Sequence, residues 1–256
     1  MTSVVSQSVV SRLRAAGCVF AEDEARLLVA AATSPADLDA MVERRVAGLP
    51  LEQVLGWAEF LGLRIALEPG VFVPRRRTEL LAWHAATLAT RGAVVVDLCC
   101  GSGAVGAAVY AAVPGIELFA SDVEPAAVRC ARRNVTGAVY EGDLYEPLPD
   151  DLRGRVNVLV ANAPYVPSDA VGLMPPEARL HEPLVALDGG TDGLEVLRRV
   201  IAEAPSWLAP GGHLLFETST RQSAAAVATV TATGLTPKVI TDEDLGATVV
   251  VAHLNP

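Results

Sequence analysis

Short apolar segments alternate with segments of helical periodicity throughout the chain beyond Gly92. This alternation is typical of a mostly parallel sheet with helices on both faces. The predicted strands are residues 94–98, 116–121, 138–142, 156–161, 212–218, 236–241 and 247–253, and the predicted helices are 103–112, 125–134, 192–204 and 222–232. Too few residues separate the last two strands for a helical crossover, so we expect the final strand to run antiparallel.

The N-terminal part of the chain has a helical pattern instead. Apolar positions recur at helical spacing from Val4 to about Leu55, and Ser34-Pro35 is typical of a helix start. These features predict a small helical domain over residues 1–58. Its size is below that of an ordinary catalytic unit, so we expect the chemistry to lie elsewhere.

The next segment joins the two parts. Residues 60–67 alternate between apolar and other positions, turn residues follow at 68–70, and an apolar run resumes at 71–73. This pattern predicts a β-hairpin. We therefore expect a hairpin linker over residues 59–74 and an α/β domain over residues 75–256.

A glycine turn follows the first strand of the α/β domain. Gly101, Gly103 and Gly106 have the spacing G-x-G-x-x-G, and Asp122 ends the next strand. Glycines allow the backbone to approach a ligand, and a carboxylate at this distance accepts hydrogen bonds from ribose hydroxyls. The spacing alone does not separate NAD from S-adenosylmethionine. Asp97 favours S-adenosylmethionine, because a carboxylate before the turn would attract a methionine amine and repel a pyrophosphate.

The run Asn162-Ala163-Pro164-Tyr165 follows another buried strand, at the edge of the sheet where α/β proteins bind ligands. An ordinary strand-ending turn is the simplest interpretation of these residues alone. In combination with the glycine turn, however, the run suits a planar NH2 group. Asn162 offers an amide oxygen, Pro164 biases Ala163 towards an extended backbone, and Tyr165 offers an aromatic face.

Composition excludes several classes of function. The net charge of −10 argues against non-specific nucleic-acid binding, which requires clustered Lys and Arg. The four cysteines lack C-x-x-C spacing, so we expect neither a metal site nor a disulfide framework. Neither a signal peptide nor an apolar run of membrane-spanning length is recognisable. We therefore expect a soluble protein of the reducing cytoplasm that does not bind membranes.

With these residues in view, the chain resembles the release-factor type of protein glutamine-N5 methyltransferases, which are class I S-adenosylmethionine-dependent enzymes. The resemblance covers nearly the whole chain and is most specific at residues 162–167 and 173–194. It implies a seven-stranded Rossmann-like sheet with a small N-terminal helical domain. It also implies an enzyme that methylates the side-chain amide of a glutamine in a protein substrate, such as a release factor or a ribosomal protein.

The resemblance implies roles for individual residues. Asn162, Ala163, Pro164 and Tyr165 would receive the substrate amide, with hydrogen bonds accepted by the Asn162 amide oxygen and the Ala163 carbonyl. The residues expected to bind S-adenosylmethionine are Asp97, Gly101, Gly103, Asp122, Asp143, Leu144 and Asn162. No metal is expected.

Three positions depart from the family pattern. Ala163 stands where the family has proline. The φ angle is therefore no longer locked, which costs about 0.5–1 kcal/mol of preorganisation. Cys99 replaces a glycine, a change that a small side chain tolerates if the φ angle there is negative. Arg76 and Arg77 replace a proline and an acidic residue, so Arg75–Arg77 is either a solvated turn or a contact for a partner.

Other functions share parts of this pattern. An adenine-N6 nucleic-acid methyltransferase needs the same grip on a planar amine after base flipping, but the acidic charge disfavours it. A non-catalytic cofactor-binding protein would also retain the glycine turn. An NAD oxidoreductase is disfavoured because no second nucleotide-binding unit follows the first.

Overall fold

The computed structural model describes the backbone of residues 2–255 and the burial of residues 6–255. Seven strands form one sheet in the order β5-β4-β3-β6-β7-β9-β8. The strands are β3 (Val94–Leu98), β4 (Glu117–Asp122), β5 (Ala138–Glu141), β6 (Val156–Ala161), β7 (Leu208–Glu217), β8 (Thr236–Asp242) and β9 (Ala247–His253). The first five run parallel, and β9 pairs antiparallel with both β7 and β8. The predicted α/β class and the antiparallel final strand are therefore confirmed.

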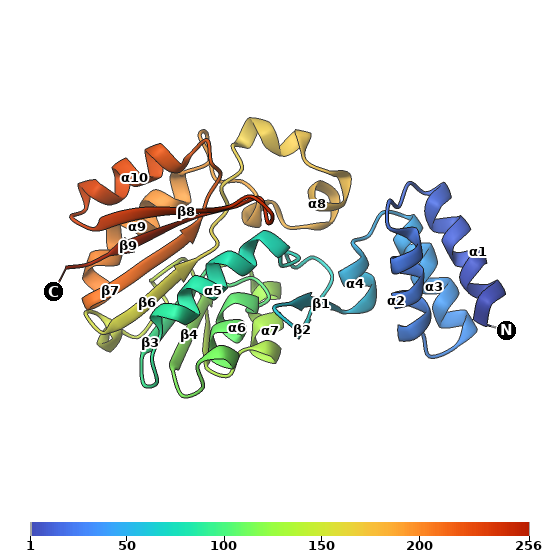
Figure 1. Ribbon diagram of the computed structural model, residues 1–256, viewed down its shortest axis with the longest axis horizontal. Helices are drawn as coiled ribbons and strands as arrows, with labels where there is room; N and C mark the ends of the chain where they lie inside the picture. The colour runs from blue at the N-terminus through green and yellow to red at the C-terminus, as the bar shows by residue number, and fades with distance from the viewer. Residues whose placement is uncertain (1, 256) are drawn as a thin grey trace.

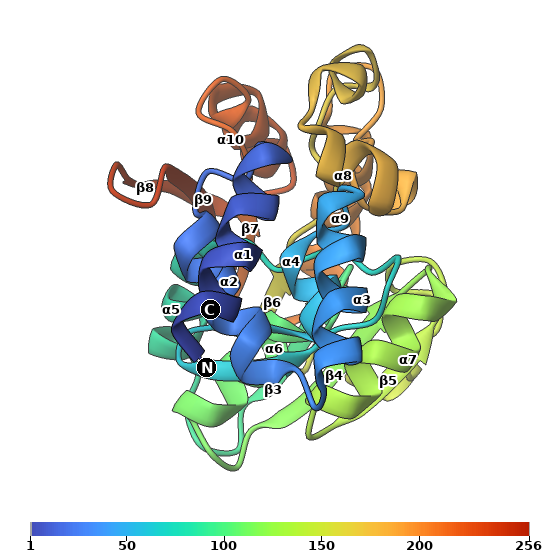
Figure 2. The ribbon, with the colours of Figure 1, turned by 90° about the vertical axis from the view of Figure 1, so that its right-hand side faces the viewer.

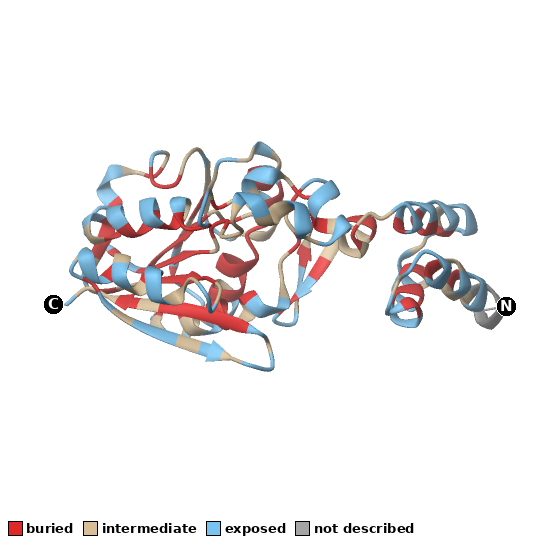
Figure 3. Cartoon of the chain, turned by 90° about the horizontal axis from the view of Figure 1, so that it is seen from above, coloured by how far each residue is buried: buried red, intermediate tan, exposed pale blue. Residues whose placement is uncertain are grey.

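Helices cover both faces of this sheet (Figure 1). On one face lie α5 (Glu79–Leu88), α6 (Ala104–Ala112) and α7 (Pro125–Asn134), and on the other lie α9 (Glu195–Trp207) and α10 (Ser223–Ala232). Successive strand residues enter opposite cores because strand side chains alternate between faces: Val94 and Val96 pack towards α9, whereas Val95 packs towards α5 and α6. The buried residues accordingly concentrate along the strands (Figure 3).

The N-terminal helices form a separate group at one end of the molecule (Figure 1). They are α1 (Thr2–Ala15), α2 (Ala21–Ala31), α3 (Pro35–Val46) and α4 (Leu51–Leu55). These helices share a hydrophobic cluster of their own that includes Leu13, Leu28 and Val42. The predicted start of α3 is confirmed, because Ser34 Oγ accepts a hydrogen bond from the Asp37 backbone N–H at 3.1 Å.

The predicted hairpin exists, but its turn lies at residues 61–62 and not at residues 68–70 as predicted. Strands β1 (Trp57–Phe60) and β2 (Leu63–Ala66) pair around Leu61 and Gly62, and residues 71–73 form no strand. Leu61 and Gly62 have φ angles of 49° and 76°, as a tight hairpin turn with two left-handed residues requires. The alternation over residues 60–67 concealed this turn, because the leucine gave no turn signal. The segment expected as the second strand instead buries its apolar side chains against α7.

A long excursion between β6 and α9 contains η3 (Ser168–Leu173), α8 (Pro176–His181) and η4 (Leu184–Ala186). Figure 2 shows α8 beside α3 and α4. Glu177 of α8 forms an ion pair with the buried Arg45 of α3, and Gln53 of α4 donates a hydrogen bond to the His181 carbonyl at 3.3 Å. The excursion therefore fastens the N-terminal helices to the sheet domain.

Two short 3₁₀ helices complete the chain, η1 (Arg76–Thr78) and η2 (Asp150–Leu152). Within residues 2–255, no helix has both the length and the apolar character needed to cross a bilayer.

Candidate active site

A cavity of about 310 Å³ opens at the carboxyl ends of β3, β4 and β6. Parallel strands bring these ends to one edge of the sheet, where α/β proteins bind ligands. The cavity brings together most of the residues singled out from the sequence. The predicted residues in its lining are Asp97, Gly101, Asp122, Asp143, Leu144, Asn162 and Pro164.

Gly101 lies at the open side of the glycine turn. Its φ angle is 54°, and a Cβ there would meet no atom within 4 Å. Its N–H donates a hydrogen bond to Asp122 Oδ2 at 2.8 Å, while Asp122 Oδ1 accepts one from the Glu124 N–H at 2.9 Å. Burial raises the pKa of Asp122. The carboxylate thus holds the turn in shape and still faces the cavity.

Gly103 does not line the cavity, contrary to the prediction that it approaches the cofactor. Its φ angle is 78°, and a Cβ would lie 2.6 Å from Val135 Cγ2 and 3.2 Å from the Ala131 Cβ. Gly103 therefore allows close packing of the turn against α7. The sequence pattern does not separate this packing role from ligand contact, because glycine serves both.

Asp97 is the last residue but one of β3 and is almost wholly buried. Its Oδ2 accepts a hydrogen bond from the Gly106 N–H at 2.9 Å, near the start of α6. A Cβ at Gly106 would lie 3.1 Å from the same oxygen, so a side chain there would crowd the carboxylate. Burial raises the pKa of Asp97 to about 7, against the lowering effect of this hydrogen bond. A cation placed beside Asp97 would favour its charged form.

The φ angle of Cys99 is 53°, so the condition of a negative φ angle is not met. This conformation is costly for a residue with a Cβ, and non-glycine residues that adopt it cluster at functional sites. Leu144, across the same cavity, has a φ angle of 50°. The backbone bends needed to shape the cavity therefore persist in this chain although one position lacks the glycine of the family pattern.

Asp143 and Leu144 lie together at the rim, as the resemblance implied. The Asp143 carboxylate forms an exposed ion pair with Arg199 of α9, 2.6 Å from Oδ2 to Nη2. The Leu144 carbonyl accepts a hydrogen bond from Ser121 Oγ at 2.7 Å. These contacts fix the loop after β5 against β4, and with it the position of the Asp143 carboxylate.

Asn162 follows β6 directly, and a hydrogen bond from its side-chain amide sets the orientation of that amide. Its Nδ2 donates a hydrogen bond to Thr78 Oγ1 at 3.4 Å, and Thr78 Oγ1 donates in turn to Glu217 Oε2 at 2.6 Å. Among the described residues no donor reaches Asn162 Oδ1. Because the amide nitrogen faces Thr78, the amide oxygen stays available to a donor in the cavity.

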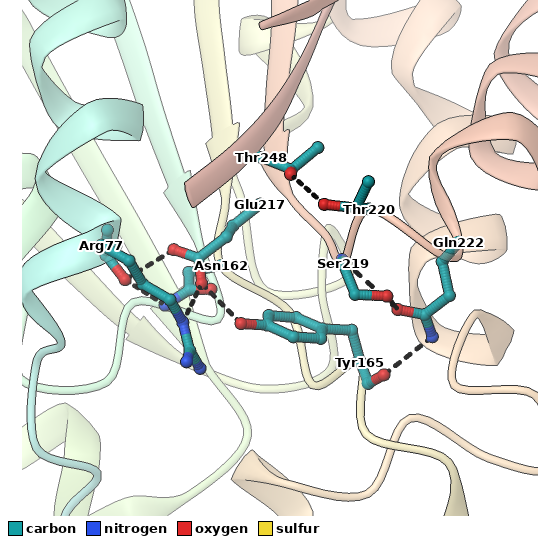
Figure 4. Close-up of polar contacts among 9 residues, drawn as sticks. Arg77, Asn162, Tyr165, Glu217, Ser219, Thr220, Gln222 and Thr248 are labelled. Atoms are coloured by element: carbon teal, nitrogen blue, oxygen red, sulfur yellow. Dashed lines mark hydrogen bonds and ion pairs between the residues drawn. The ribbon is translucent and has the colours of Figure 1, made fainter. Parts of the chain in front are cut away.

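Glu217 collects three hydrogen bonds at the end of β7 (Figure 4). Besides Thr78, the Tyr165 hydroxyl donates to Oε1 at 2.6 Å and Arg77 Nε donates to the same oxygen at 2.9 Å. The Glu217 side chain is 2% exposed. Burial and the neighbouring carboxylate raise the pKa of Tyr165, so its hydroxyl keeps its proton. Glu217 is therefore the anchor of this network.

The remaining residues of the 162–165 run occupy different surroundings. Pro164 lines the cavity, whereas the Ala163 side chain is buried in the core. No N–H of the described residues donates to the Ala163 carbonyl, which leaves this acceptor free. Tyr165 is not in the lining of this cavity, and its hydroxyl faces Glu217. Its contact with the substrate amide stays a prediction.

Two glycines, Gly189 and Gly193, pack closely against the backbone of the 162–165 run. A Cβ at Gly189 would lie 2.6 Å from the Pro164 carbonyl oxygen, and one at Gly193 would lie 2.3 Å from the Tyr165 carbonyl oxygen. Gln222 Nε2 donates to that Tyr165 oxygen at 2.8 Å. Close backbone packing thus explains the glycine-rich segment after the excursion.

The arginine run is neither a purely solvated turn nor wholly free for a partner. Arg75 forms an ion pair with the buried Glu182, 2.6 Å between Nη2 and Oε2, and Arg77 is tied to Glu217. Arg76 is exposed and has no ion pair within the described chain. Sequence reasoning missed these pairs because each carboxylate lies more than a hundred residues downstream.

Comparison with known proteins agrees with this geometry. Residues 62–174 match the methyltransferase small domain family. The chain is 36% identical over 199 residues to the release factor glutamine methyltransferase of Geobacter sulfurreducens, covering 76% of this chain and 69% of that protein. It is 37% identical to the enzyme of the same name from Mycolicibacterium smegmatis, covering 87% and 82% of the two chains.

A relative with another name is equally similar. The 4-amino-L-phenylalanine/4-methylamino-L-phenylalanine methyltransferase of Streptomyces pristinaespiralis is 37% identical over 240 residues, covering 84% of this chain and 81% of that protein. Among solved structures, a methyltransferase from Pyrococcus furiosus shares the fold with a TM-score of 0.57 and 16% identity, over 85% and 98% of the two chains. The identities and coverage show that the chain belongs to the release factor glutamine methyltransferase family.

Proposed function

We propose that the protein is an S-adenosylmethionine-dependent methyltransferase that acts on the side-chain amide nitrogen of a glutamine in a protein substrate, with a peptide-chain release factor as the first candidate. The observation that carries the proposal is the orientation of Asn162. Its free amide oxygen lies in the same cavity as the glycine turn and three carboxylates, Asp97, Asp122 and Asp143. A planar amide and a methyl donor would meet there.

The residues of the cavity fit S-adenosylmethionine. Asp97 suits the ammonium group, Asp122 the ribose hydroxyls, and Asp143 the exocyclic amine of adenine, because each group donates hydrogen bonds to carboxylates. Val123 and Leu144 offer apolar surface for the purine. Gly101 leaves the backbone open to the ligand. When bound, the cofactor supplies an electrophilic methyl group on a sulfonium.

The chain's own residues address the poor nucleophilicity of an amide nitrogen. The Asn162 amide oxygen and the Ala163 carbonyl would accept the two N–H groups of the substrate. They would hold the nitrogen in place and stabilise the positive charge that develops on it. Preorganised acceptors of this kind contribute about 2.7–4 kcal/mol each. Thr78 and Glu217 keep Asn162 in the required orientation, so their role is positioning.

A second candidate substrate has direct support. The Streptomyces relative, as its name states, acts on the aromatic amine of 4-amino-L-phenylalanine. An arylamine is also a planar NH2 group, and it would use the same two acceptors. Of the departures from the family pattern, Arg77 lies beside Tyr165 and Glu217, on the side of the site where the two candidate substrates would differ.

We place the reaction in the cytoplasm. All four cysteines are free thiols, which suits a reducing compartment. The net charge of −10 also favours a protein or small-molecule substrate over direct nucleic-acid binding.

The test is incubation with S-adenosylmethionine carrying a labelled methyl group and three substrates in parallel: a purified release factor, 4-amino-L-phenylalanine, and an adenine-containing oligonucleotide. Mass spectrometry then locates the label. Label on a glutamine side chain supports the first proposal, and label on the aromatic amine supports the second. Label only on adenine, or a lack of binding to S-adenosylmethionine in calorimetry, would overturn both.

A further inference from the structure

A second cavity, of about 560 Å³, lies on the other side of the Glu217 network from the first. Neighbouring residues face the two cavities, because Thr78 and Pro164 line the first whereas Arg77 and Tyr165 line the second. Arg77, Thr78 and Tyr165 all donate hydrogen bonds to Glu217, which Figure 4 shows for Arg77 and Tyr165, and Pro164 directly precedes Tyr165. A substrate group in the second cavity would therefore lie close to an amine held at Asn162.

The second cavity has the opposite electrostatic character to the first. Its described lining contains Arg77 and Arg221 and no acidic side chain, in a chain of net charge −10. Four acidic residues line the other cavity, Asp97, Asp122, Glu124 and Asp143, with Arg199 as its one basic residue. The hydroxyl and amide groups that complete the second lining are those of Thr218, Ser219, Thr220, Gln222 and Thr248.

Arg77 still has donors to offer. Only its Nε bonds to Glu217, and neither terminal nitrogen pairs with a carboxylate within the described chain. Its guanidinium carbon lies 5.7 Å from the centre of the Tyr165 ring, and its side chain is 44% exposed. A guanidinium held at one edge, with its planar fork free, is preorganised to bind a carboxylate through two hydrogen bonds.

Thr218 gives an independent indication of a ligand. Thr218 is 3% exposed, and its Oγ1 is buried without any hydrogen-bond partner. Buried hydroxyl groups normally have a partner, and an unpaired one is costly. An oxyanion in the cavity that Thr218 lines would accept this hydrogen bond.

We propose that the second cavity is a carboxylate subsite of the substrate-binding region, in which Arg77, Arg221 and Thr218 select a substrate that carries a carboxylate near its reactive amine or amide. The inference rests on the proposed function for the identity of the reacting group. Two sources supply the same chemistry: an acidic residue next to the methylated glutamine, or the α-carboxylate of an amino acid such as 4-amino-L-phenylalanine. Arg77 stands where the family pattern has an acidic residue, which would repel a substrate carboxylate.

The test compares substrates that differ only in the carboxylate. One pair is a glutamine peptide with Asp or Asn beside the glutamine, and the other is 4-amino-L-phenylalanine and its carboxamide. Affinity is measured by calorimetry, and methyl transfer is measured separately. At least one carboxylate form should bind about tenfold more tightly than its neutral counterpart, which corresponds to a single charge-assisted contact. The pair that shows the difference identifies the source.

Variants assign the effect. R77Q and R221Q should each reduce the preference for the carboxylate form, whereas R76Q is the matched control, because Arg76 is exposed and lines neither cavity. T218V should reduce the preference without lowering the melting temperature, since it removes an unpaired hydroxyl and keeps the shape. The readout is the ratio of affinities, so a general loss of activity in R77Q does not imitate the result.

Equal affinities for charged and neutral forms in the unmodified protein would overturn the subsite. A preference that survives in R77Q, R221Q and T218V would overturn it as well. If none of the substrates is methylated but the carboxylate forms bind more tightly and lose this advantage in R77Q, the subsite stands and the proposed function fails. The calorimetric and transfer measurements therefore separate the two failures.

Discussion

The two cavities on either side of Glu217 differ in both charge and family pattern. The first is lined by Asp97, Asp122 and Asp143 and contains most of the residues predicted from the resemblance. The second is lined by Arg77 and Arg221. Arg77 replaces an acidic residue of the family pattern, while the carboxylates of the first cavity match it. The acidic residues of the first cavity therefore agree with the family pattern, whereas Arg77 in the second cavity departs from it.

The sharpest test of the comparison is N162A, because Asn162 lines the first cavity and bonds through Thr78 to Glu217, whose partners Arg77 and Tyr165 line the second. Loss of one preorganised acceptor should lower kcat by about 10²–10³-fold. Affinity for S-adenosylmethionine, measured by calorimetry, should change little, because carboxylates of the first cavity carry that binding. A large loss of cofactor affinity with little change in kcat would place Asn162 on the cofactor side alone.

The substitution E217Q should affect both halves of the site through the network. Glu217 accepts all three of its hydrogen bonds. The amide nitrogen of a glutamine cannot accept, so at least one donor would lose its partner. Hydrogen bonds to charged groups contribute about 1.5–3 kcal/mol, and we expect a stability loss of this order in thermal unfolding. The value of kcat should fall with it, as Asn162 loses its orientation. Full activity in a less stable E217Q protein would make Glu217 purely structural.

The electrostatics of the first cavity predict a pH dependence. Burial raises the pKa of Asp97 to about 7. A bound ammonium group would lower it, so cofactor binding should release a proton below pH 7. Affinity for S-adenosylmethionine should fall by up to about tenfold per pH unit as the pH drops below 7, and level off above it. D97N should bind more weakly at pH 8 and show a flat profile. The same slope in D97N would assign the titration to another group.

Asp97 also affects the stability of the fold with the opposite trend. Its folded pKa lies above the unfolded value, so the native state holds the proton more tightly. Stability therefore falls as pH rises from about 4 to about 7. Thermal unfolding of the ligand-free protein at pH 5 and pH 8 measures this trend, and D97N should weaken it.

The smallest expected effect concerns Cys99. Replacing a left-handed non-glycine residue by glycine relieves about 1 kcal/mol of backbone strain. C99G should raise the melting temperature slightly and increase cofactor affinity a few-fold. C99A is the matched control, because it shortens the side chain and retains the strained φ angle of 53°. Equal gains in C99A and C99G would attribute the effect to side-chain volume.

Local patterns predicted those parts of the structure that local physics specifies. Residues 94–98, 156–161 and 247–253 were predicted as strands with their observed bounds, because each is a continuous apolar run between turn residues. The hairpin turn was misplaced, since Leu61 adopts a left-handed conformation that leucine does not signal. Gly103 was assigned to the ligand although it serves packing against α7. In both cases the residue type does not specify the role: leucine occurs in strands and here in a turn, and glycine occurs at ligand contacts and here at a packing contact.

The sequence by itself determined the α/β class, the glycine turn and the position of the 162–165 run after a buried strand, because each depends on residues close together in the chain. Only the tertiary structure decided what the long-range pairs do. Arg77 and Glu217 are 140 residues apart, and Thr78 and Glu217 are 139 apart. Their meeting requires η1 and α5 to pack against β7, and Asn162 joins them because β6 lies beside β7 in the sheet. Periodicity carries no information about such pairings, so the network that orients Asn162, and the second cavity beside it, became visible only in the folded chain.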